Sequence, residues 1–285
     1  WRPARRRRPV PFAQKIAEHL RLAKGMVRHH LAGPGAAKKI FVVGTGRSGT
    51  HWLGYIIGAH PDVVATVERP PIFPWVTEMA LRPETVRVLY PRLVRRYRHE
   101  HGAVLPKHYL DKSHPNIWIA ELLAESLPEA LFVGIRRDAF GTVNSMLQHE
   151  GVLSWIHRWR EFPLPSRFLG VDVDSAEAYD ALPLEAKCAV RWKAHVLQLA
   201  HLEGALGDRL LVLDYESLQT EIATELSRIS AFLGLATPIP LPHIKTRSLD
   251  RWRHELTEAQ QRNIADAIRS FPVYHPAADR RRAAA

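Results

Sequence analysis

Residues 44 to 52 combine the side chains and the turn that bind a tetrahedral anion. An apolar run, Lys39–Val43, stops at Gly44 and leads through a glycine-rich turn into a helical pattern. A strand that turns in this way into a helix directs several backbone N–H groups and the positive helix end at one point, where a phosphate-like group can bind. Arg47 adds a guanidinium fork at that point. The predicted anion-binding residues are Arg47, Ser48, Gly49, Thr50, His51 and Trp52.

The loop differs from the loop that binds ATP in P-loop kinases. Gly44 and Gly49 have the required spacing, but Thr50 and His51 follow them, where a P-loop needs Lys and then Ser or Thr. The cation lies inside the loop instead, at Arg47. The sequence therefore predicts a phosphate-like ligand that is held without the P-loop lysine.

The run Gly46–Leu53 resembles the sulfotransferase family, whose members transfer a sulfuryl group from 3′-phosphoadenosine 5′-phosphosulfate (PAPS). In that family an Arg at a strand end and a Ser eight residues on hold the 3′-phosphate of the donor, and Arg137 and Ser145 match this pattern. Asp138 would start the helix, and Ser145 lies about two turns further along, so that both side chains can face one anion. The resemblance covers residues 38 to 272 and implies PAPS as the co-substrate.

Two later segments extend this resemblance. The run Leu211–Leu218 looks like the late strand of the family with its Tyr-Glu pair, and residues 245 to 252 look like the loop that closes over the donor. The resemblance therefore implies donor contacts from both segments. These contacts are assigned to Tyr215, Lys245, Arg247 and Ser248.

Two residues compete for the role of the base that takes the proton of the acceptor hydroxyl. Glu68 resembles the base of the tyrosylprotein sulfotransferase branch, and burial would have to raise its pKa for it to work near neutrality. His114 is the alternative, because residues 112 to 114 resemble the Lys-Thr-His signature of cytosolic sulfotransferases and imidazole has the more suitable pKa. Glu68 is preferred as the base, and His114 stays open.

Lys112 keeps its role whichever of the two branches the segment resembles. This resemblance implies that Lys112 acts on the sulfuryl group and the leaving oxygen. The catalytic candidates are Glu68, Lys112, His114 and Arg47.

Three apolar runs are expected to form the strands that position these residues, at 39–43, 130–135 and 210–213. Each is followed by a helical pattern, which predicts an α/β fold: a single P-loop-type domain of three layers, with a central parallel sheet flanked by helices. Helices are expected at 116–126, 140–149, 184–206, 218–233 and 255–270.

Two segments rich in aromatic residues are expected to shape the acceptor cleft. They are the proline-rich piece Pro70–Trp75, interpreted as a rigid loop, and the stretch Val152–Phe168 with Trp155 and Trp159. Residues 161 to 180 are interpreted as irregular surface with turns.

The net charge of +11 comes almost entirely from the N-terminus. Residues 1 to 39 hold eleven Lys and Arg against one acid, Glu18, whereas the other 246 residues hold 29 basic and 28 acidic groups. The chain therefore divides into a basic N-terminal arm (1–38), a sulfotransferase domain (39–275) and a basic tail (276–285). Since the body is nearly neutral, the positive field belongs to the arm, and no specific nucleic-acid partner is expected.

The arm contains a predicted amphipathic helix, Phe12–Leu31, with an apolar stripe and basic residues on its other faces. Such a helix can lie on an anionic membrane surface or pack its stripe on the core of its own domain. The packed arrangement is preferred, and the membrane stays open. The stripe consists of Phe12, Ile16, Leu20, Ala23 and Val27.

Composition excludes several other classes of protein. With 285 residues, 46% of them hydrophobic, the chain can bury one sizeable core. Cys188 is the only cysteine, which excludes an intrachain disulfide and a cysteine metal cluster, and the 16 His residues lack zinc-ligand spacing, so no metal is predicted. No apolar run approaches the roughly 20 residues of a membrane-spanning helix. The predicted location is cytoplasmic, with peripheral membrane placement and an anchor upstream of Trp1 left open.

These patterns together predict an enzyme that transfers a sulfuryl group from PAPS, in line and without a metal, to an acceptor hydroxyl. The acceptor is of carbohydrate, lipid or tyrosine type, and the aromatic residues give a preference for the first two. A P-loop kinase-like phosphotransferase is one alternative. The other is a membrane or nucleic-acid adaptor that works through the basic arm without catalysis.

Overall fold

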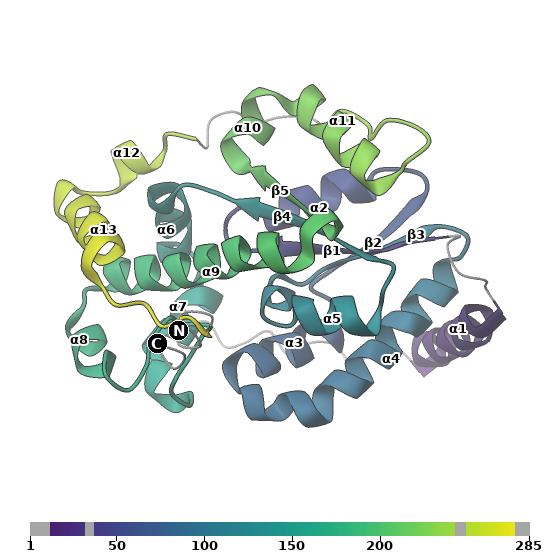
Figure 1. Ribbon diagram of the computed structural model, residues 1–285, viewed down its shortest axis with the longest axis horizontal. Coiled ribbons are helices and arrows are strands. Elements are labelled where there is room, and N and C mark those ends of the chain that lie inside the picture. Colours follow the sequence, from purple (N-terminus) through teal and green to yellow (C-terminus); the bar gives the residue numbers. More distant parts are fainter. Residues whose placement is uncertain (1–11, 32–36, 243–248, 277–285) are drawn as a thin grey trace.

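The computed structural model describes residues 12–31, 37–242 and 249–276. Five parallel strands form a central sheet in the order β2-β3-β1-β4-β5, with helices on both faces (Figure 1). The predicted α/β class with a parallel sheet between helical layers is therefore confirmed. The strands are β1 Lys39–Gly44, β2 Val63–Val67, β3 His108–Lys112, β4 Ala130–Arg136 and β5 Leu210–Asp214.

The helices follow the strands in the alternating pattern of α/β proteins. The expected helix at 184–206 is confirmed as α9, and the expected helix at 12–31 is confirmed as α1. In the described part of the chain, no helix combines the length and the hydrophobicity that a bilayer crossing requires. The α-helices are α1 Phe12–Leu31, α2 Thr50–Gly58, α3 Ile72–Leu81, α4 Val86–Val104, α5 Ala120–Ser126, α6 Ala139–Leu147, α7 Glu150–His157, α8 Ala176–Ala181, α9 Leu184–Leu206, α10 Tyr215–Thr220, α11 Ile222–Leu233, α12 Trp252–Glu255 and α13 Glu258–Ser270.

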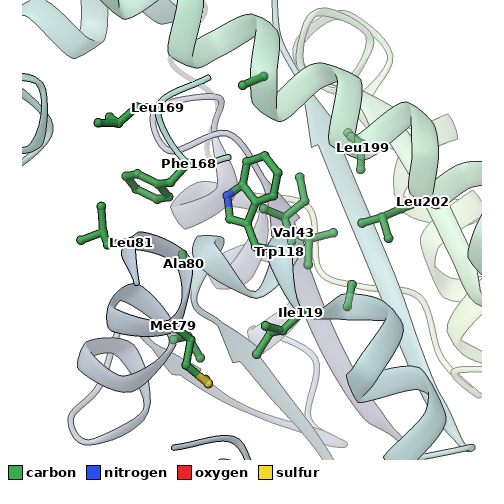
Figure 2. Close-up of a cluster of buried hydrophobic side chains, with 14 of the residues drawn as sticks. Val43, Met79, Ala80, Leu81, Trp118, Ile119, Phe168, Leu169, Leu199 and Leu202 are labelled. Atoms are coloured by element: carbon green, nitrogen blue, oxygen red, sulfur yellow. The ribbon is translucent and has the colours of Figure 1, made fainter. Parts of the chain in front are cut away.

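The central strand β1 is buried on both faces, which explains its continuous apolar sequence. Because side chains alternate along a strand, Phe41 and Val43 enter one core cluster, while Ile40 and Val42 enter the other. The larger cluster packs the sheet against α4, α5 and α9, and Trp118 lies inside it near Val43 (Figure 2). The smaller cluster packs the opposite face against α2 and α11.

The carboxyl ends of all five strands lie at one edge of the sheet, because the strands are parallel. The chain winds from β1 outward to β2, returns to β3, and then crosses β1 to reach β4 and β5. Ligands of open α/β sheets bind at such a reversal, outside the strand ends. The segments that follow the strands at this edge begin at Thr45, Glu68, Ser113, Arg137 and Tyr215. The fold therefore gathers every described candidate segment at one edge.

Several sequence-based expectations about local structure are wrong. The proline-rich piece is not a loop throughout, since α3 begins at Ile72. Residues 161 to 180 are not simply surface, because Phe168, Leu169 and Val171 are fully buried. These apolar side chains fill the core from a turn closed by the Ser166–Val171 bridge, so that no helical or strand period marks their burial.

The helix α1 also departs from the preferred interpretation. It packs along α4, but its apolar stripe does not enter a core: Ile16, Leu20 and Val27 are exposed. The stripe is therefore turned away from the helix on which α1 lies.

Candidate active site

The loop after β1 has the conformation and the buried hydroxyls that suit an anion. Arg47 and Gly49 have positive φ angles of 81° and 94°, and no side chain caps the start of α2. Ser48 Oγ and Thr50 Oγ1 are buried and form no hydrogen bond with the described residues. A buried hydroxyl without a partner is costly, and an anion at this helix start would accept from both hydroxyls. The loop therefore fits a phosphate or sulfate group.

Tyr215, at the start of α10, packs against this loop from the end of β5. A Cβ atom on Gly49 would lie 2.5 Å from Tyr215 Cδ2, so the ring leaves room only for glycine. The guanidinium carbon of Arg137 lies 4.3 Å from the centre of the same ring, a cation–π distance. The neighbouring Glu216 accepts a hydrogen bond from the Asp138 backbone N–H at 3.2 Å. The end of β5 thus holds the loops after β1 and β4 together.

Gly49→Ala is expected to destabilise the protein by about 2 kcal/mol or more, because a methyl group adds a clash with Tyr215 to an unfavourable φ. Urea denaturation measures the change. Gly204→Ala is the matched control: no atom lies within 4 Å of the added Cβ in α9, and Ala stabilises an exposed helix position by about 0.5 kcal/mol. Equal stability of the two variants would contradict this interpretation of the loop.

The two predicted anion-binding segments meet directly. Arg47 Nε donates a hydrogen bond to Ser145 Oγ at 3.2 Å. Arg137 follows β4, and its carbonyl accepts a hydrogen bond from Trp192 Nε1 at 3.0 Å. Asp138 caps α6 through a bond from Gly141 N–H to its carboxylate, as the Arg-to-Ser spacing anticipated. Arg137 and Ser145 consequently line one cavity of about 150 Å³.

Other residues of this cavity were missing from the sequence-based assignment. Asn144 lies on the same helix as Ser145, and Gln148 is the C-cap of that helix. Arg251 and Trp252 belong to the segment that resembles the closing loop. Glu255 accepts hydrogen bonds from Asn144 and Gln148 and pairs with Arg251 at 2.6 Å. The i, i+4 spacing of Asn144 and Gln148 is the one signal that could have identified them.

The other residues predicted to bind the donor lie in different places in the structure. Lys245, Arg247 and Ser248 lie outside the described residues. Trp52 is half-buried, with its ring in an edge-on contact with Tyr215 at 6.0 Å between centroids. His51 is exposed at the start of α2 and belongs to a second cluster, which contains the catalytic candidates.

Glu68, Lys112 and His114 form one hydrogen-bonded cluster at the ends of β2 and β3. Glu68 has a positive φ of 47°, and its N–H donates to the Lys112 carbonyl at 2.9 Å. Glu68 Oε1 pairs with Lys112 Nζ and lies 3.1 Å from His114 Nδ1. Lys112 Nζ also donates to His51 Nδ1 at 2.8 Å. Left-handed backbone at Arg47 and at Glu68 is the kind of strain that clusters at functional sites.

The pKa values in this cluster differ from the sequence-based expectation. Burial raises the pKa of Glu68, but the hydrogen bond from His114 and the charge of Lys112 outweigh burial and hold this pKa at about 2. The increase in pKa that Glu68 would need to be a base with a pKa near neutrality is therefore not found. Burial lowers the pKa of Lys112 to about 8, although Glu68 opposes the shift, and burial lowers the pKa of His114 to about 3. At neutral pH the cluster holds a carboxylate, an ammonium group and a neutral imidazole.

A buried carboxylate below the cluster fixes the end of β3. Asp111 accepts hydrogen bonds from Tyr97 Oη at 3.0 Å and from Asn116 Nδ2 at 2.9 Å. Thr66 Oγ1 donates to it at 3.2 Å from the neighbouring strand. Burial raises the pKa of Asp111 to about 6. This network ties β2 to β3 one residue before Lys112, so it orients both strands that carry the catalytic candidates.

Metal ligands do not gather in the described ranges, where no group of three or more His, Cys, Asp or Glu could hold an ion. In the described ranges, cations that face the candidate active site include Arg47, Lys112, Arg137 and Arg251.

Comparison with known proteins identifies the family. The family model of the sulfotransferase domain matches residues 37–273. None of the curated proteins matches the chain in sequence. Among solved structures, the sulfotransferase domain of the curacin biosynthetic pathway matches with 12% identity and a TM-score of 0.52, over 81% of this chain and 97% of that chain. The sulfotransferase domain of the Synechococcus PCC 7002 olefin synthase matches with 15% identity and a TM-score of 0.51, over 86% and 98%.

The two structural matches support the fold, and the family model covers most of the chain. The prediction of a sulfotransferase enzyme with an α/β fold is therefore confirmed. The chain belongs to the sulfotransferase family and catalyses sulfuryl transfer.

Proposed function

We propose that the protein transfers the sulfuryl group of PAPS to a hydroxyl group, with Glu68 as the base. The observation that carries this proposal is the hydrogen bond from Arg47 Nε to Ser145 Oγ at 3.2 Å. It joins a loop that suits a phosphosulfate to a cavity that Arg137 and Ser145 line. A donor that carries one anion on the 3′-oxygen and another on the 5′-oxygen of the same ribose needs two such sites side by side.

The residues of the site would divide the donor between them. The 5′-phosphosulfate would be held by Ser48, Thr50 and the start of α2. The hydroxyls of Ser48 and Thr50 have no hydrogen-bond partner among the described residues, and no side chain caps the backbone N–H groups at the start of α2. Arg137 and Ser145 would hold the 3′-phosphate through charge-assisted hydrogen bonds. Trp52 and Tyr215 would pack close to the nucleoside. PAPS supplies the activated sulfuryl group when it is bound.

Exposure favours Glu68 over His114 as the group that takes the acceptor proton. The Glu68 side chain is 22% exposed, whereas the His114 side chain is 6% exposed. Glu68 Oε1 is occupied by Lys112 and His114, while Oε2 lies 3.4 Å from Nε2 of His51, an imidazole whose pKa is lowered by burial. Oε2 is therefore the oxygen that an acceptor hydroxyl could reach. His114 is then a positioning residue, which fixes the carboxylate.

A carboxylate with a pKa of about 2 can serve as this base if the proton leaves late. As the acceptor oxygen bonds to sulfur, its proton becomes strongly acidic, and Glu68 Oε2 takes it. The bond from sulfur to the phosphate oxygen breaks, and the phosphate leaves with the electron pair. Lys112 and Arg47 would stabilise the charge that develops on the sulfuryl and leaving oxygens.

Aromatic rings beside the cluster support an acceptor with an apolar face. The Phe73 ring lies 5.8 Å from the His114 ring, and the Trp155 ring lies 6.1 Å from it. Both aromatic rings are partly exposed, whereas Trp159 is buried against Tyr179 and belongs to the core. We therefore propose that the hydroxyl belongs to a carbohydrate or a lipid, which can lie against such rings.

An acceptor panel tests the proposed reaction. The protein is incubated with PAPS and sugars, lipid alcohols and phenols, and mass spectrometry measures the products. The expected result is a sulfated sugar or lipid together with an equal amount of 3′-phosphoadenosine 5′-phosphate (PAP). Phosphorylation of an acceptor by ATP and Mg²⁺, without use of PAPS, would contradict the proposal and favour the kinase-like alternative.

The activity is expected to fall at high pH because Lys112 loses its charge. With a pKa of about 8, this side chain supplies an ammonium group only below that pH, so kcat/KM should decrease as the pH rises through about 8. A pH profile of kcat/KM measures the limb. In Lys112→Arg the guanidinium stays charged, and the limb should move beyond pH 10 or so. An unchanged limb in Lys112→Arg would show that another group titrates.

A further inference from the structure

The exposed apolar side chains of the protein are concentrated on α1. Of the eleven large hydrophobic residues that are exposed in the described ranges, five lie on this helix. Leu20, Val27 and Leu31 are 66%, 53% and 80% exposed. Together with Ile16 and Ala23 they repeat every three or four residues and so share one face of the helix. A continuous apolar stripe of this kind marks an interaction site.

The contact between α1 and α4 explains why this stripe faces outward. Gly25 lies on the opposite face of α1, where a Cβ atom would come within 2.2 Å of the His99 carbonyl oxygen. Gly102 meets Gly25 from α4 in the same way, so the two backbones touch. Ion pairs flank this contact: Arg21 with Glu100 and Arg96 with Glu18, both at 2.7 Å. Figure 1 shows α1 lying along α4 at the edge of the molecule.

The charge around the stripe selects the partner. Glu18, the only acid of α1, is paired with Arg96, so no acid accompanies the stripe. Lys24 is exposed beside it, and α4 presents exposed Arg92 and Arg95 in the turn before Arg96. The sequence before the helix, residues 1 to 11, adds five Arg and no acid. Each Lys or Arg close to an anionic leaflet contributes about 1 kcal/mol of attraction.

We propose that α1 docks the protein on an anionic lipid bilayer. The helix would lie in the plane of the interface, with Leu20, Val27 and Leu31 among the acyl chains and the basic groups at the headgroups. Because α1 is clamped to α4 by its glycine face, it can enter the interface without leaving the domain. This proposal does not depend on the donor or on the acceptor of the reaction.

Vesicle flotation of the full chain tests the proposal. The vesicles contain phosphatidylcholine alone or with phosphatidylserine. Binding is expected only with phosphatidylserine, and high salt should weaken it. Replacing Leu20 and Val27 with Gln should weaken binding by about tenfold or more. The matched control replaces Leu197 and Leu241, two exposed leucines elsewhere, and should bind as the wild type does.

A second variant and one further measurement separate this proposal from its rivals. Lys24→Glu with Arg92→Glu keeps the stripe but should also weaken binding to phosphatidylserine vesicles. All six substituted positions are exposed, and circular dichroism tests whether each variant is folded. Absence of binding, or undiminished binding by the Leu20 and Val27 variant, would overturn the proposal. So would a wild-type dimer in size-exclusion chromatography that this variant converts to a monomer, because the stripe would then belong to a second copy of the chain.

Discussion

Glu68→Gln is expected to lower kcat by about a thousandfold while the binding of PAP changes little. Glutamine has nearly the shape of glutamate but cannot take the acceptor proton. It also lacks the negative charge that pairs with Lys112 and accepts from His114. Steady-state kinetics with an acceptor from the panel measures kcat, and calorimetry measures PAP binding. Loss of rate without loss of donor affinity identifies a group that acts in the transition state.

Two comparisons make this result specific. Glu78→Gln, on the exposed part of α3 where Glu78 pairs with Arg82, is the matched control and should keep full activity. His114→Asn should remove a positioning contact, so that the pKa of Glu68 rises and an acid limb appears in the pH profile. If His114→Asn instead abolishes activity while Glu68→Gln keeps most of it, the imidazole is the base.

Lys112→Met is expected to lower kcat by about a hundredfold or more. Lys112 is fully buried, and the aliphatic part of its side chain packs on Gly54, where a Cβ atom would lie 3.1 Å from Lys112 Cβ. Methionine keeps much of this packing but removes the ammonium group from the cluster. The pKa of Glu68 should also rise, because the charge of Lys112 is one of its main stabilising interactions.

Lys193→Met is the control for loss of a bonded lysine. Lys193 Nζ donates to the Ile268 and Phe271 carbonyls and takes no part in the cluster. This variant should lose some thermal stability and keep its kcat. A Lys112→Met enzyme with unchanged kcat would exclude Lys112 from the transition state. Thermal denaturation of both variants shows whether a lower kcat results from a smaller fraction of folded protein.

The donor-binding segments could be predicted from the sequence because each is local. Arg47 lies within a single strand-loop-helix, and the spacing from Arg137 to Ser145 follows from a strand end and two helical turns. That Arg47 contacts Ser145 could not be predicted, since it depends on β1 and β4 being neighbours. Tyr215 likewise reaches Gly49 only because β5 lies beside β4.

The cluster around Glu68 shows why the choice of base was left open. Glu68 and His114 follow β2 and β3, which were not among the strands expected from the sequence. The β3 sequence, His108–Lys112, is too polar to stand out as an apolar run, whereas β2, Val63–Val67, is apolar and was missed. The pairing of these strands brings Glu68 Oε1 and His114 Nδ1 to 3.1 Å from each other, a contact that the sequence does not reveal. The pKa of Glu68 is lowered, not raised, because the hydrogen bond from His114 and the charge of the buried Lys112 outweigh the effect of burial.

The orientation of α1 is decided by a tertiary contact that opposes the hydrophobic pattern of the helix. Hydrophobic periodicity predicts that the stripe of Leu20 and Val27 faces the core. Close contact between the Gly25 and Gly102 backbones favours the opposite face, and the ion pair of Arg21 with Glu100 adds to it. Glycine does not contribute to a hydrophobic pattern, so the sequence did not indicate that the Gly25 face of α1 packs on α4.

Calorimetric titration with PAP and with AMP tests the central claim, that the loops after β1 and β4 form one donor site with a place for the 3′-phosphate. The two ligands differ only in that phosphate. The wild type is expected to bind PAP about a hundredfold more tightly than AMP, and Arg137→Ala should remove most of the difference. Equal affinity of the wild type for both ligands, or a preference that survives in Arg137→Ala, would contradict the assignment.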